Sequence, residues 1–213
     1  MDLESSKNLG GVGALLLVIA SVGFFGTPFV GLLGLVGIIL VLIALKGMSD
    51  HYKEAGIFNN ALYAVIIAII GGVAFVAAIV ASVFAFLSNL PAWARTLIES
   101  GEWAGLASEF RARALTDISF IWPFIGGIIL ALVVLFIFAV IAMVFFRKSL
   151  SSLSTKTGVG LFGTAGLLML IGAVLTIIII GFLLIWIAWI LLIVAFFSVK
   201  TQAAPQPTPQ PPP

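Results

Sequence analysis

One short segment of the sequence holds the side chains best suited to bind a metal ion or to move a proton, namely Asp50, His51 and Glu54. His51 is the single histidine of the chain. If the segment is helical, His51 and Glu54 share a face, and Asp50 can add a further ligand. Zinc sites usually need about three or four ligands with firm hydrogen-bonded support behind them. The sequence supplies no such support, so we interpret the segment as a solvated loop and predict no metal site.

Further polar residues follow in the same part of the chain. Asn59 and Asn60 stand just ahead of a long apolar run, where asparagine often caps a helix by accepting bonds from free backbone N–H groups. We favour this capping role over a polar binding site for the pair. Six residues together define what we call the candidate polar surface: Asp50, His51, Tyr52, Glu54, Asn59 and Asn60.

Catalysis and ion-coupled transport need ionisable groups in a shielded site. The long apolar segments contain no Asp, Glu, His, Lys or Arg, and the chain has no cysteine, which excludes disulfides and thiolate chemistry. The polar side chains of these segments are serine and threonine, whose hydroxyls can bond back to their own helix. We therefore predict no catalytic residue, no bound cofactor and no enzymatic activity.

The distribution of charge predicts the elements that carry these residues. The chain has 213 residues, with 10 Lys or Arg and 8 Asp or Glu. Soluble domains contain about 25% charged residues, whereas this chain contains 8%, together with 62% hydrophobic residues. Charge-free intervals of 38, 40, 29 and 43 residues follow Lys7, Glu54, Asp117 and Lys156. This pattern excludes a soluble protein and a nucleic-acid partner, and it predicts an integral protein of the lipid bilayer.

A helix needs about 20 apolar residues to cross the bilayer, so the four intervals have room for six spans. Gly26-Thr27-Pro28 divides the first interval, and a turn within 175–181 divides the last. We predict an all-α, polytopic bundle that forms a single transmembrane domain over residues 1–200. The expected spans are 9–25, 29–46, 60–88, 118–146, 158–175 and 178–199. The proline-rich stretch 201–213 is expected to be a disordered or polyproline tail.

The basic residues predict how the chain is oriented. Cytoplasmic loops of membrane proteins carry an excess of Lys and Arg. Six spans place seven basic residues on one side: Lys7, Lys46, Lys53, Arg147, Lys148, Lys156 and Lys200. The opposite side holds Arg95, Arg111 and Arg113. We therefore expect a multi-pass protein of the cell membrane with both termini in the cytoplasm.

The loop over 89–117 is the largest segment expected outside the membrane. Its aromatic and aliphatic residues fall on one face of each of two short helices: Trp93, Leu97 and Ile98 on the first, and Trp103, Leu106 and Phe110 on the second. Such helices lie in the membrane interface, with tryptophan at the level of the lipid headgroups. We favour a simple cover over the bundle, and a gate or docking surface is the alternative.

Two features concern the packing of the helices. Residues 14–22 align with 166–174, and 42–45 align with 193–196, so either the first and last helix pairs are a duplication or they share only an apolar composition. The two middle spans share an Ile-Gly-Gly sequence, and small residues allow membrane helices to approach closely. The candidate packing glycines are Gly71, Gly72, Gly126 and Gly127.

Several short motifs resemble a known family. These are Lys7-Asn8-Leu9-Gly10-Gly11, Ser49-Asp50-His51-Tyr52, Ile57-Phe58-Asn59-Asn60-Ala61, Phe162-Gly163-Thr164-Ala165-Gly166 and Ala195-Phe196-Phe197-Ser198. They are similar to a domain-of-unknown-function family of archaeal and some bacterial membrane proteins, number nine hundred and ninety-six. The resemblance covers about residues 5–200 but not the loop after the third span or the proline tail. It implies a cell-membrane protein and no known activity, and it marks Ser49 to Asn60 as the most recognisable polar stretch.

The function that best fits these features is a non-enzymatic scaffold or a component of a membrane complex. The lack of ionisable groups in the spans and the glycines spread along the helices favour this function. The expected partner is either another membrane protein or a second copy of the chain. The alternative is a small carrier or channel for an uncharged or lipidic solute.

Overall fold

The structure is a computed structural model, and it describes residues 2–23, 29–113, 121–178 and 180–200. All regular structure in these ranges is helical. The expected break at Gly26-Thr27-Pro28 and the proline-rich tail lie outside the described residues.

Six helices are long and apolar enough to cross a membrane. They are α1 (Leu3–Gly23), α2 (Phe29–Tyr52), α3 (Ala55–Ser88), α6 (Trp122–Thr157), α7 (Gly160–Leu175) and α8 (Ile180–Phe197). Two short helices, α4 (Ala92–Ser100) and α5 (Trp103–Arg113), follow α3. In the interval 175–181, a 3-10 turn at Thr176–Ile178 separates α7 from α8. The prediction of an all-α protein with six long apolar helices is confirmed.

Some helices extend beyond the predicted spans, because a helix does not stop where its side chains become polar. Helix α3 begins at Ala55 rather than at residue 60, and α6 continues to Thr157 rather than ending at residue 146. Gly158, with a φ of 70°, ends α6 in the left-handed conformation that glycine adopts easily. At the start of α1, the Ser5 backbone N–H donates to the Asp2 carboxylate at 2.9 Å. Bonds from the Ser5 hydroxyl and N–H lower the pKa of Asp2 below its ordinary value.

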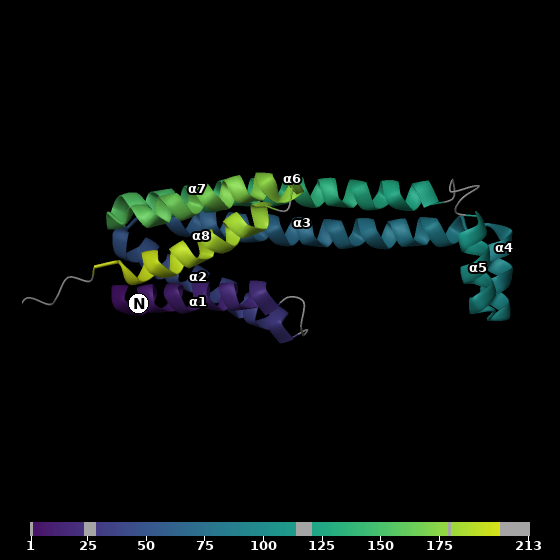
Figure 1. Ribbon diagram of the computed structural model, residues 1–213. Coiled ribbons are helices and arrows are strands. Elements are labelled where there is room, and N and C mark those ends of the chain that lie inside the picture. The colour runs from purple at the N-terminus through teal and green to yellow at the C-terminus, as the bar shows by residue number, and fades with distance from the viewer. Residues whose placement is uncertain (1, 24–28, 114–120, 179, 201–213) are drawn as a thin grey trace, which may run out of the picture. The chain divides into compact units, whose positions relative to one another are not determined.

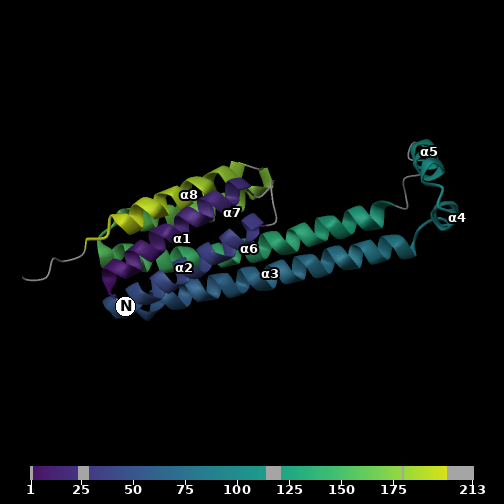
Figure 2. The same cartoon turned by 90° about the horizontal axis from the view of Figure 1, so that it is seen from below.

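The chain divides into two compact units, which we describe separately. Unit 1 comprises Met1–Ile66 and Val140–Pro213. In it, α1, α2, α7 and α8 lie side by side with the parts of α3 and α6 that belong to this unit (Figures 1 and 2). The largest buried side chains of the unit include Phe162, Phe196 and Leu45, and the rings of Phe162 and Phe196 meet edge to face with centroids 5.1 Å apart.

In unit 1, the first helix pair (α1 and α2) and the last (α7 and α8) each have a pair of glycines at the contact between the two helices. A Cβ added to Gly13 would lie 2.8 Å from the Gly37 carbonyl oxygen, so α1 and α2 touch backbone to backbone. A Cβ added to Gly172 would lie 2.9 Å from the Gly181 carbonyl oxygen, which brings α7 equally close to α8. Small residues at these positions let membrane helices pack closely enough for dispersion forces to hold them.

Positions that align between the two hairpins are buried alike. Ala44 aligns with Ala195 and Leu45 with Phe196, and all four are fully buried. The two hairpins therefore present equivalent faces to the same core, whichever origin accounts for their alignment.

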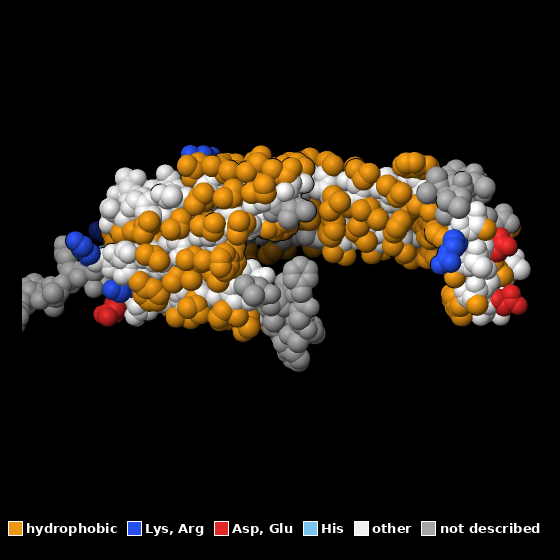
Figure 3. All heavy atoms as spheres, viewed as in Figure 1, with side chains coloured by type: hydrophobic (Ala, Val, Ile, Leu, Met, Phe, Trp, Pro, Cys, Tyr) orange, Lys and Arg blue, Asp and Glu red, His pale blue; other side chains and the backbone are white. Residues whose placement is uncertain are grey.

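Unit 2 comprises Ile67–Ala139. Within it, α3 and α6 run antiparallel and side by side (Figure 2). Gly71 of α3 meets Phe138 of α6, and Ser82 of α3 meets Gly127 of α6. The two contacts are about three helical turns apart on each helix, so the same two faces stay together along the pair. Hydrophobic side chains cover the visible outer face of these helices, as expected for contact with lipid (Figure 3).

Candidate functional site

The candidate polar surface surrounds a tight corner between α2 and α3. The Glu54 N–H donates to the Ser49 carbonyl at 3.0 Å, and the Ser49 hydroxyl donates to the Glu54 carbonyl at 2.8 Å. Lys53 lies between them in the left-handed region, with a φ of 50°. The reciprocal bonds close the corner, and Lys53 bears the conformational cost of the reversal because a side chain disfavours positive φ.

The corner is tied to α6 by one buried bond and one ion pair. The Ser149 hydroxyl donates to the Ile57 carbonyl at 2.5 Å, and both residues are fully buried. The Lys156 ammonium lies 3.3 Å from the Glu54 carboxylate. Their side chains are 43% and 37% exposed, so solvent screens the pair and it contributes about 1 kcal/mol at most. The buried Ser149 bond is therefore the stronger link between α3 and α6 in unit 1.

The six residues of the candidate polar surface lie along the end of α2 and the start of α3 rather than around one cavity. Asp50 pairs with Lys46 at 2.7 Å, one helical turn away, and both side chains are exposed. His51 contacts the edge of the Tyr52 ring, with centroids 4.9 Å apart. His51 and Asn59 are exposed, whereas Tyr52, Glu54 and Asn60 are half-buried. Among the residues that the structure describes, no three His, Cys, Asp or Glu side chains gather as metal ligands would.

The capping role predicted for Asn59 and Asn60 is wrong. Helix α3 begins at Ala55, so both residues lie inside it. The Asn60 amide donates to the Gly56 carbonyl at 2.7 Å, one turn earlier in the same helix. The left-handed Lys53 reverses the chain before Ala55, and nothing after Ala55 stops the helix. The start of the apolar run was therefore a poor marker of the start of the helix.

The four candidate packing glycines fall into two classes. A Cβ on Gly71 would clash with the Phe138 side chain, and a Cβ on Gly127 would clash with the Ser82 side chain. Gly72 and Gly126 have no heavy atom within 4 Å of an added Cβ. The first two glycines thus hold α3 against α6, and the other two face away from this contact.

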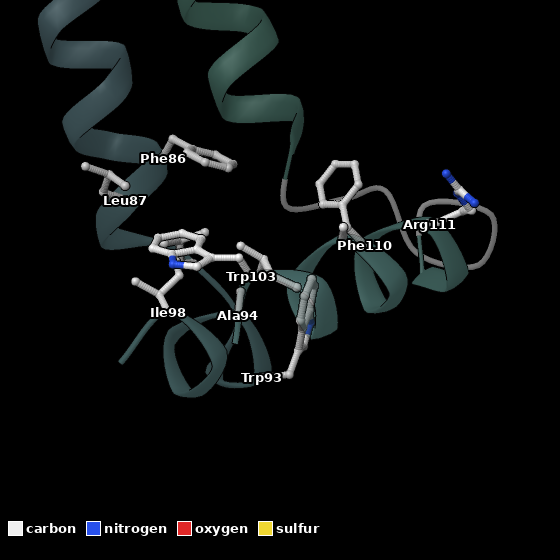
Figure 4. A pocket seen from close by; sticks show the side chains of 11 residues that line it. Phe86, Leu87, Trp93, Ala94, Ile98, Trp103, Phe110 and Arg111 are labelled. Atoms are coloured by element: carbon white, nitrogen blue, oxygen red, sulfur yellow. The ribbon is translucent and has the colours of Figure 1, made fainter. Parts of the chain in front are cut away.

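A pocket in unit 2 is the site that the sequence did not identify. It has a volume of about 810 Å³ and is lined by the end of α3 together with α4 and α5. Figure 4 shows Phe86, Trp93, Trp103 and Phe110 at the pocket, with Arg111 at its outer edge and directed away from these rings. The sequence signal was the apolar stripe on each short helix, which we assigned to the membrane interface. The structure brings residues of both stripes to the same cavity.

Replacing Lys53 tests the cost of the left-handed corner. We expect Lys53→Gly to be more stable than Lys53→Ala by about 1 kcal/mol, because glycine adopts positive φ without the steric clash of a Cβ. Both variants remove the same charge, so the comparison isolates the backbone. Thermal unfolding of the purified protein in detergent measures the difference, and equal midpoints would contradict it.

Comparisons with known proteins identify relatives without a known activity. The family described as "Protein of unknown function (DUF996)" matches residues 33–190. The chain is 35% identical over 199 residues to the uncharacterized protein MJ1644 of Methanocaldococcus jannaschii, an alignment that covers 93% of each chain. No solved structure matches it. These matches confirm the resemblance seen in the motifs: the chain has an archaeal relative in MJ1644, and it belongs to the DUF996 family.

Proposed function

We propose that this protein is a non-enzymatic component of a membrane complex, embedded in the cell membrane with both termini in the cytoplasm. It acts by offering packing surfaces to a neighbouring membrane protein or to a second copy of itself. The six long apolar helices support residence in a bilayer. The excess of basic residues near the chain ends, the α2–α3 corner and the end of α6 supports the orientation.

The outward-facing glycines carry the proposal. Gly72 and Gly126 leave open space on the long helices of unit 2, where an added Cβ would meet nothing within 4 Å. A glycine on a lipid-facing surface exposes backbone that lipid chains pack against poorly, whereas another helix can approach it closely. The internal contact of α3 with α6 uses Gly71 and Gly127 instead, so the open pair is not needed to form the hairpin.

The polar groups of the apolar helices also support an interaction role. The Ser82 hydroxyl donates to the Ala78 carbonyl at 2.7 Å, and the Thr176 hydroxyl donates to the Ala173 carbonyl at 2.7 Å. Ser21 and Thr164 bond back to their own helices in the same way. Each of these hydroxyls is satisfied within its own helix, whereas a role in chemistry would require it to face a substrate.

Site-specific photo-crosslinking in native membranes tests the proposal. A photoreactive residue at position 72 or 126 is expected to yield one reproducible crosslinked band, containing either a partner protein or a second copy of the chain. Position 31 is the matched control, because Gly31 is also a helical glycine with nothing within 4 Å, and it lies in unit 1. Two further variants combine Gly72→Leu with the probe at 126 and Gly126→Leu with the probe at 72. Loss of the crosslinked band in either one shows that the replaced glycine is required for the contact.

Two results would count against the scaffold. If probes at positions 72 and 126 both gave no crosslink and the protein were monomeric, the scaffold proposal would be contradicted. Solute-specific flux in liposomes that is lost in Gly72→Leu or Gly126→Leu would instead support the carrier or channel. Tags at the two termini check the orientation, which fails if they are accessible from opposite sides of the membrane.

A further inference from the structure

The pocket at the end of α3 has the chemistry of a lipid site. Its wall combines Phe86 and Leu87 of α3 with Trp93 of α4 and Phe110 of α5, and the only charged residue among the described residues that line it is Arg111. Small-molecule sites have volumes of about 300–1,000 Å³ and are mostly apolar with a few placed polar groups. The cavity of about 810 Å³ fits this description.

The arginines of this region differ in their surroundings. The Arg95 guanidinium donates to the Ser88 carbonyl and so satisfies the free end of α3. Arg111 stands in the last turn of α5, at the pocket, where no acidic residue is among the described lining residues. An exposed arginine at the edge of an apolar cavity matches a ligand with an anionic head outside the cavity and an apolar chain inside it.

The side chains around the cavity are of the kind found at a membrane interface. Trp103 is 65% exposed and Phe110 is 41% exposed, and both border the pocket. Aromatic side chains of this kind collect at the headgroup level of a bilayer. The cavity is lined by Phe86 and Leu87 near the end of α3 at Ser88, so an apolar chain in it would contact the last apolar turn of that helix.

We propose that this pocket binds one anionic phospholipid, with an acyl chain along the aromatic wall and the phosphate on Arg111. The site is independent of the outward glycines and of the proposed scaffold role. Its ligand comes from the surrounding membrane, and the lipid chain supplies most of the contact area.

Binding is measured with the full-length protein in detergent, by native mass spectrometry and by quenching of tryptophan fluorescence with chain-brominated lipids. The probes are phosphatidylglycerol and phosphatidylcholine with the same chains. We expect phosphatidylglycerol to bind about five- to tenfold more tightly, because one partly exposed charge-assisted contact distinguishes the headgroups. Arg111→Gln should remove this preference, and Arg147→Gln, which changes an exposed arginine of unit 1, should keep it.

A second pair of variants tests the cavity itself. Ala107 lines the pocket and Ala104 does not, although both are exposed on α5. Ala107→Trp should abolish binding of both lipids, whereas Ala104→Trp should leave it unchanged. Equal binding by these two variants, or an unchanged preference in Arg111→Gln, would overturn the proposal. Displacement of the lipid by free glycerol phosphate would show an anion site without a role for the chain, and it would also overturn the lipid assignment.

Discussion

Gly181→Ala is expected to destabilise the α7–α8 hairpin by about 3 kcal/mol, at the upper end of the cost of overpacking. A Cβ on Gly181 would overlap the Gly172 carbonyl oxygen and the backbone at Leu175 and Thr176. These are main-chain atoms, which cannot move aside as a side-chain end can. The added methyl group must therefore separate the two helices or open the turn at Thr176–Ile178.

The matched control for this variant is Gly160→Ala. Gly160 stands in the first turn of α7, as Gly181 does in the first turn of α8, and an added Cβ there meets nothing within 4 Å. Alanine is a better helix former than glycine, so Gly160→Ala should be neutral or slightly stabilising. Thermal unfolding followed by size-exclusion chromatography in detergent compares the two. Similar midpoints for both variants would mean that α7 and α8 do not pack as closely as the glycine pair requires.

The contact of α1 with α8 should behave as a coupled pair. Phe196 is fully buried, and its ring occupies the space that a side chain at Gly10 would need. We expect Phe196→Ala to cost about 3 kcal/mol, the lower end for phenylalanine in a core, because lipid is apolar and the loss is mainly one of packing. Gly10→Ala should cost about 1–3 kcal/mol by overpacking.

The double variant Gly10→Ala with Phe196→Ala reports the coupling. The added methyl group enters the space that the ring has left, so the combined loss should fall short of the sum of the single losses by about 1 kcal/mol. Unfolding in mixed detergent and sodium dodecyl sulfate measures all three variants. Gly31→Ala with Phe196→Ala is the control pair, since Gly31 has open space around it, and its effects should add. Additive losses for the Gly10 pair would show that the two residues are not in contact.

The candidate polar surface depends on contacts between segments that are far apart in the sequence. His51, Asp50 and Glu54 were identified by residue type, and the prediction that they bind no metal came from the lack of further ligands in the sequence. The partners of these residues were not predictable, because Lys156 and Ser149 are about a hundred residues away along the chain and meet the corner only after α6 packs on α3 in unit 1. The position of Asn60 inside a helix likewise depended on the backbone reversal at Lys53, for which the sequence offers no glycine.

The glycines show most clearly what the sequence predicts and what only the tertiary structure reveals. The sequence by itself determined that the chain has six long apolar helices that could cross a membrane, because its charge-free intervals are long enough to span a bilayer once or twice each. It also determined that glycines were available for close packing. Only the tertiary structure decided that Gly71 and Gly127 face a neighbouring helix while Gly72 and Gly126 face away, and that two amphipathic stripes form one pocket. The physical reason is that the spacing of residues fixes the helix face on which each one lies. Which other segment packs against that face depends on contacts between parts of the chain that are far apart in sequence.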